Sequence, residues 1–243
     1  MGKHPRVSTT DALSQRWRRL ALEIPRRKKP GEYEHVGPTD FRPLQIYFGG
    51  GTPKRLYYFT KDERCLDWKV EKCFPKGMRA ITRYGVPTDE IIDTIRKLVA
   101  DTGLDLWFVG DLDPHDLTVF AVLRNGNAYL EGKPRDALPV RYLGIDDRWI
   151  GICEKYLENG QPIESMTMPM RLLERELYEL VREMLPDLPQ LVGPRAFALL
   201  EAGMTLDFIG ATNPAFYDEP FWDVITAHIL RARPRMYRVP ARR

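Results

Sequence analysis

Short apolar runs alternate with segments of helical periodicity along the middle of the chain. Apolar runs of strand length occur at 44–48, 55–59, 76–83, 104–109 and 139–144, and helical patterns lie at 62–72, 88–102, 117–124, 149–158 and 169–184. Glycine, proline and asparagine separate many of these segments, as they do at turns. This alternation predicts an α/β fold with a mainly parallel sheet flanked by helices.

The apolar run at 104–109 leads directly into two carboxylates. It continues as Gly110-Asp111-Leu112-Asp113-Pro114. Side chains two residues apart on an extended segment point the same way, so Asp111 and Asp113 are expected to converge. Open α/β sheets bind ligands at the carboxyl ends of their strands, and paired carboxylates favour Mg²⁺ or Mn²⁺. The alternative is structural: Asp111 caps the next helix and Asp113-Pro114 is only a turn.

Charge is distributed unevenly along the chain. Residues 1–30 contain nine Lys/Arg against two Asp/Glu, and residues 231–243 contain six arginines and no acid, although the whole chain carries only +3. The body between these basic ends is therefore acidic. Basic arms of this kind contact nucleic acid in many proteins, because each bound cation releases counterions from the phosphates. Solvated tails that touch the acidic body are the competing explanation.

Composition indicates a soluble globular chain. Of the 243 residues, 43% are hydrophobic and 29% are charged, and no apolar run approaches the roughly 20 residues that span a bilayer. The N-terminus lacks the apolar core of a secretory signal. Three cysteines without a Cys-x-x-Cys pair favour a reduced, cytoplasmic protein with no membrane partner.

The same patterns divide the chain into four parts. We expect a basic N-terminal helix and linker at 1–43, an α/β domain at 44–160, a helical C-terminal extension at 161–230 and a basic tail at 231–243. The N-terminal helix is predicted at 12–23, before a proline- and arginine-rich linker. The segment 191–230 is expected to be helical, with aromatic residues in the core.

Residues 54–150 resemble a Toprim domain, in particular that of the topoisomerase VI A subunit and of the nuclease subunit of Wadjet-type plasmid-defence systems. Three segments carry the resemblance: Gly110 to Pro114, Thr82-Arg-Tyr-Gly-Val-Pro87 before a helix, and Tyr142-Leu-Gly144 followed by Asp146-Asp147. The resemblance implies a Toprim-like sheet. It also implies that Asp111 and Asp113 bind Mg²⁺ or Mn²⁺ in a site that cleaves or transesterifies phosphodiesters.

Two departures from the family pattern concern catalysis. The family has a catalytic Glu at the end of its first strand, where this chain has Thr60, and Glu63 is the acid that a shift of register would bring in. Asp116 stands where the family has glycine and either joins the site or caps the following helix. The winged-helix domain of the topoisomerases is not apparent in the fifty or so residues before the match. Tyr47, Tyr57 and Tyr58 are expected in the core, so no covalent tyrosyl–DNA intermediate is expected.

The sequence therefore supports two principal hypotheses. The first is a Mg²⁺-dependent nucleic-acid phosphodiesterase, a DNA nuclease or topoisomerase-related subunit, with Glu63 as acid/base and Lys61, Arg64 and Arg83 as phosphate contacts. The second is a degenerate, non-catalytic Toprim-like module that binds DNA or partner subunits in a larger complex. A phosphatase of the haloacid-dehalogenase type is disfavoured, because its Asp-x-Asp continues Gly-Thr near the N-terminus rather than Pro114-His115 in mid-chain.

Overall fold

The computed structural model describes residues 45–48, 55–60, 78–82, 85–126, 138–156 and 163–207. The strands of its larger sheet are β1 (Gln45–Phe48), β2 (Arg55–Phe59), β3 (Met78–Thr82), β4 (Leu106–Val109) and β5 (Val140–Tyr142). The α-helices are α3 (Asp89–Thr102), α4 (Pro114–Asn125), α5 (Asp147–Tyr156), α6 (Leu172–Met184), α7 (Leu188–Val192) and α8 (Pro194–Glu201). A 3₁₀ helix, η2 (Ile163–Met166), and two short strands, β6 (Met168–Pro169) and β7 (Met204–Thr205), complete the described elements. The helices expected at 12–23 and 62–72 lie outside the described residues.

The larger sheet is mainly parallel, as predicted. Its strand order is β1-β3-β2-β4-β5, and β3, β2, β4 and β5 run parallel while β1 pairs antiparallel with β3. The connection from β2 leads outward to β3, whereas β3 leads back across β2 to β4. The chain therefore reverses its direction of travel between β2 and β4. This is the topological switch point, the position at which open α/β sheets form a ligand crevice.

The register brings the carboxyl ends of β2 and β4 side by side. Phe59 pairs with Val109, and the Thr60 N–H donates to the Val109 carbonyl at 3.4 Å. Thr60 therefore lies next to the start of the Gly110–Pro114 segment. The sequence placed both groups at strand ends, but only the parallel pairing of β2 with β4 makes them neighbours.

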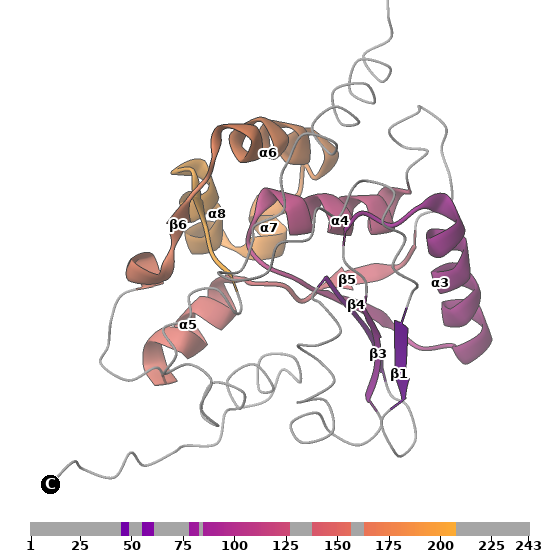
Figure 1. Cartoon of the computed structure of the whole chain (residues 1–243). Coiled ribbons are helices and arrows are strands. Elements are labelled where there is room, and N and C mark those ends of the chain that lie inside the picture. Colours follow the sequence, from indigo (N-terminus) through magenta and orange to yellow (C-terminus); the bar gives the residue numbers. More distant parts are fainter. Residues whose placement is uncertain are drawn as a thin grey trace, which may run out of the picture.

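Helix α4 is the central helix of the described fold. Nearly every residue from Pro114 to Leu123 is buried, since the helix lies between the sheet and α6 (Figure 1). It begins three residues before the predicted 117–124, because proline is well suited to the first helical turn and Asp113 caps it. On the sheet side, the Phe108 ring contacts the rings of Tyr58, Phe120 and Tyr142.

The described part of the C-terminal segment packs on the α/β body. Helix α6 lies along α4, and α8 contacts α5 (Figure 1). The predicted helix at 169–184 begins only at Leu172, because Met168 and Pro169 form β6, which pairs with β7. The expectation that 191–230 is helical is wrong at 204–205, which form β7 after the chain turns at Gly203 with φ 72°. The rest of that segment, from 208 to 230, lies outside the described residues.

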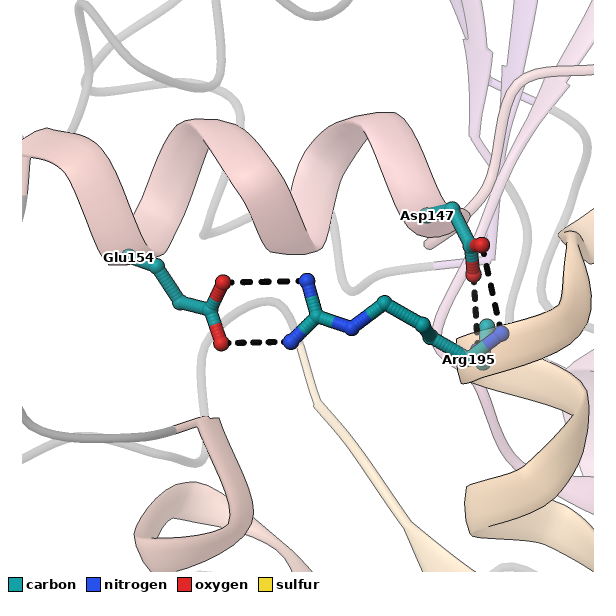
Figure 2. A network of polar contacts seen from close by, with 4 residues as sticks. Asp147, Glu154 and Arg195 are labelled. Atoms are coloured by element: carbon teal, nitrogen blue, oxygen red, sulfur yellow. Dashed lines mark hydrogen bonds and ion pairs between the residues drawn. The ribbon is translucent and has the colours of Figure 1, made fainter.

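A polar network holds α8 against α5 (Figure 2). The Asp147 carboxylate accepts hydrogen bonds from the backbone N–H groups of Arg195 and Ala196, at 3.2 and 2.8 Å. The Arg195 guanidinium donates to both oxygens of Glu154, at 3.0 and 2.6 Å. Asp147 therefore caps the N-terminus of α8 from outside that helix, where negative charge is favourable.

In the described part of the chain, we find no helix with both the length and the apolar character needed to cross a membrane.

Candidate metal centre

Three aspartates converge at the carboxyl end of β4. Ligand oxygens of Asp111, Asp113 and Asp116 all lie within 4.8 Å of one another. The side chains of Asp111 and Asp116 are buried, with exposed fractions of 4% and 6%, and Asp113 is half-buried. The two aspartates predicted from the sequence are thus together. Of the two alternatives for Asp116, the structure shows the first: Asp116 joins the cluster, and the helix is capped by Asp113.

Asp113 also caps helix α4. Its Oδ1 accepts a hydrogen bond from the Asp116 N–H at 2.7 Å, and its backbone is extended, as is usual at an N-cap. The structural alternative assigned the cap to Asp111, and the structure assigns it to Asp113 instead. A carboxylate has two oxygens and several lone pairs, so capping and metal binding by the same side chain are chemically compatible.

Asp116 joins the two strand ends. Its Oδ2 accepts a hydrogen bond from the Asp111 N–H at 2.7 Å and another from the Thr60 hydroxyl at 2.6 Å. Asp116 lies in the first turn of α4, so its position depends on the cap made by Asp113. Thr60, which is also buried, therefore belongs to the wall of the cluster.

The neighbouring tyrosine remains protonated beside these acids. Burial raises the pKa of Tyr142 well above its ordinary range, and the nearby carboxylates of Asp146, Asp116 and Asp113 raise it further. The Tyr142 hydroxyl donates to the Ile145 carbonyl at 3.1 Å. Tyr142 is therefore a neutral hydrogen-bond donor with no role as a phenolate nucleophile at neutral pH.

The cluster fits a hard divalent cation. All of its donors are carboxylate oxygens, which Mg²⁺, Mn²⁺ and Ca²⁺ prefer. Mg–O distances of about 2.1 Å place opposite ligands about 4.2 Å apart, and Ca–O distances of about 2.4 Å place them about 4.8 Å apart. Oxygens that all lie within 4.8 Å of one another can therefore reach a single cation of this size range. Without a cation, mostly buried carboxylates at this spacing repel one another.

The other predicted site residues are not described by the structure. Glu63, Lys61, Arg64 and Arg83 all lie outside the described residues, so their positions relative to the cluster stay predictions. Tyr57 and Tyr58 are buried in the core, as expected. Tyr47 lies in β1, and its side chain is not among those described.

The acids after β5 have capping positions. Asp146 Oδ1 accepts from the Trp149 N–H at 2.8 Å at the start of α5, and Asp147 caps α8 as described above. The sequence revealed neither α8 as the partner of Asp147 nor Thr60 as a partner of Asp116. Both contacts join residues that are distant in the sequence, and local patterns carry no signal for them.

The loop before Asp111 requires a glycine at position 110. A Cβ at Gly110 would lie 2.7 Å from a ring carbon of Phe108 and 2.9 Å from Asp116 Oδ2. Because the Phe108 ring is enclosed by other aromatic rings, we expect Gly110→Ala to lower the free energy of unfolding by about 1–3 kcal/mol. Urea denaturation measures this loss. Unchanged stability would show that the loop relaxes more easily than its packing indicates.

Comparison with known proteins returned no matching family model and no curated protein that matches the chain in sequence.

Proposed function

We propose that this chain binds Mg²⁺ or Mn²⁺ at Asp111, Asp113 and Asp116 and acts as a metal-dependent nucleic-acid phosphodiesterase, as a DNA nuclease or topoisomerase-related subunit. The observation that carries the proposal is the convergence of three carboxylates within 4.8 Å at the switch point of a parallel sheet. The Toprim-like sequence features at the same position support the choice of phosphodiester chemistry.

Each aspartate has a distinct part in the proposal. Asp111 and Asp113 are the principal metal pair, and Asp116 adds a third carboxylate to the site. The Asp116 Oδ2 also orients Asp111, because it accepts a hydrogen bond from the Asp111 N–H. When bound, the metal ion would polarise the phosphoryl oxygen and stabilise the departing alkoxide. Thr60 has no carboxylate with which to act as a general acid or base near neutral pH. Glu63 is the residue proposed for that step.

Nucleic acid is the proposed substrate because of the charge distribution. The acidic metal site by itself would repel a polyanion, and the basic segments 1–30 and 231–243 supply the opposite charge within the same chain. Lys61, Arg64 and Arg83 are proposed as phosphate contacts near the strand ends. Other subunits of a larger complex are proposed partners.

The proposal is tested with supercoiled plasmid DNA. The purified chain is incubated with plasmid in EDTA, Mg²⁺, Mn²⁺ or Ca²⁺, and the nicked and linear products are resolved on a gel. We expect nicking or linearisation in Mg²⁺ or Mn²⁺, none in EDTA, and loss of activity in Asp111→Ala. The absence of cleavage with every metal, by a preparation that binds Mn²⁺, would reject the enzymatic function.

A second candidate is a non-catalytic module that binds DNA or a partner subunit. The observation that favours it is the Thr60–Asp116 hydrogen bond, since this chain has a hydroxyl at the end of β2, where Toprim enzymes carry their catalytic Glu. This module would slow the migration of plasmid DNA in a gel-shift assay, in EDTA as well as in Mg²⁺, without producing nicked or linear DNA. The same samples used in the cleavage assay therefore distinguish the two candidates.

A further inference from the structure

The residue between the two metal-pair aspartates is bonded to the C-terminal segment. The Leu112 N–H donates to the Leu206 carbonyl at 2.8 Å, and the Leu206 N–H donates to the Leu112 carbonyl at 3.0 Å. These reciprocal bonds form an isolated antiparallel bridge. Both leucine side chains are fully buried, so the bridge lies in the core and is shielded from water.

Leu206 itself is firmly held within the C-terminal segment. Thr205 pairs with Met168 between β7 and β6, and its hydroxyl donates to the Met168 carbonyl at 3.2 Å. The Met170 N–H donates to the Gly203 carbonyl at 2.7 Å. We call residues 203–206 the strap. Because the strap is bonded to β6 on one side and to Leu112 on the other, the position of Leu112 depends on that of the C-terminal segment.

The Leu112–Leu206 bridge bears on the three-aspartate cluster because of the directions in which the side chains of residues 111–113 point. Neighbouring side chains on an extended segment point to opposite sides, so the burial of Leu112 in the core directs Asp111 and Asp113 away from it. If Leu112 moved or rotated, the two carboxylates would move with it. A cation that needs oxygens at fixed spacing would then lose its geometry.

We infer that Leu206 is a positioning residue, and that docking of the strap and binding of a divalent cation at the three aspartates are thermodynamically linked. This inference rests on the proposed metal site and adds a means of its regulation. Whatever displaces the strap weakens cation binding, and cation binding in turn holds the strap in place, because coupling between two equilibria is reciprocal.

The test compares two variants of the full chain at Leu206. Leu206→Pro removes the N–H that bonds to Leu112, whereas Leu206→Ala removes most of the side chain and retains that N–H. Mn²⁺ affinity is measured from the signal of free Mn²⁺ in electron paramagnetic resonance. We expect at least tenfold weaker binding in Leu206→Pro and a change of less than about threefold in Leu206→Ala.

If Leu206→Pro does not fold, amide hydrogen exchange of the wild-type chain tests the same linkage. Saturating Mn²⁺ is expected to slow exchange of the Leu112 and Leu206 amides at least tenfold more than exchange of the Gly103 amide at the end of α3. Equal slowing at all three sites, or unchanged affinity in a folded Leu206→Pro, would overturn the inference while leaving the metal site intact. Failure of the wild type to bind Mn²⁺ would instead overturn the proposed function and, with it, this inference.

Discussion

Asp111→Asn is expected to abolish the metal response and, at the same time, to stabilise the metal-free protein. Two unit charges no more than 4.8 Å apart repel by roughly 3 kcal/mol or more at an effective dielectric constant near 20. Removing one of the three charges should therefore raise the free energy of unfolding by about 1–3 kcal/mol in EDTA. In the wild type, a cation present at a hundred times its Kd raises the free energy of unfolding by about 2.7 kcal/mol. Asp111→Asn, which does not bind the cation, is expected to lack this gain. Cleavage by the variant should fall at least 100-fold.

Thermal melts in EDTA and in Mn²⁺ measure both halves of this prediction. The wild-type Tm should rise by roughly 5–10 °C with Mn²⁺. The Asp111→Asn Tm should start above that of the wild type in EDTA and stay there in Mn²⁺. A variant that melts lower than the wild type in EDTA would show that Asp111 serves structure and that mutual repulsion is not the dominant effect.

Two further variants separate charge from capping. Asp113→Asn retains an N-cap acceptor for the Asp116 N–H, because asparagine caps helices as well as aspartate does. We therefore expect it to fold and to lose most of its metal response. Asp146→Asn makes the same change at the cap of α5, outside the cluster, and should leave the Mn²⁺ shift unchanged. An equal loss in both variants would point to a general effect of charge.

Gly193→Ala is expected to be the more destabilising of two alanine substitutions at glycines with positive φ. Gly193 has φ 89° and ψ 162°, a region that is essentially restricted to glycine. A Cβ there would lie 2.5 Å from the Asp147 Cγ and would push away the carboxylate that caps α8. Strain of about 1–3 kcal/mol, together with a lost cap of about 0.5–2 kcal/mol, gives a total of about 1.5–5 kcal/mol. The Tm should therefore fall by roughly 10 °C.

Gly103→Ala provides the control for Gly193→Ala. Gly103 also has positive φ, at 63°, but a Cβ there meets no atom within 4 Å. The control should cost only about 1–2 kcal/mol, the penalty of the left-handed conformation. Chemical denaturation of both variants isolates the contribution of Asp147. Equal losses would mean that the crowding at Gly193 is relieved at little cost and that the α8 cap survives.

Local sequence was sufficient to predict several elements of the fold. The apolar run at 104–109 contains the buried strand β4 at 106–109. Acidic residues after Thr88 together with Gly103 mark the ends of α3. Asp111 and Asp113 were predicted to converge because their spacing on an extended segment is a local property. The cap at Asp113 is also local, although the structural alternative assigned it to Asp111.

The sequence alone determined that a strand of this chain ends in closely spaced carboxylates, because periodicity and spacing depend on neighbouring residues. Only the tertiary structure decided that Thr60 bonds to Asp116, 56 residues away, and that Leu206 bonds to Leu112. These partners are set by the order of strands in the sheet and by the return of the C-terminal segment to Leu112, just after β4. Such long-range pairing depends on how the whole core packs, and no local window contains it.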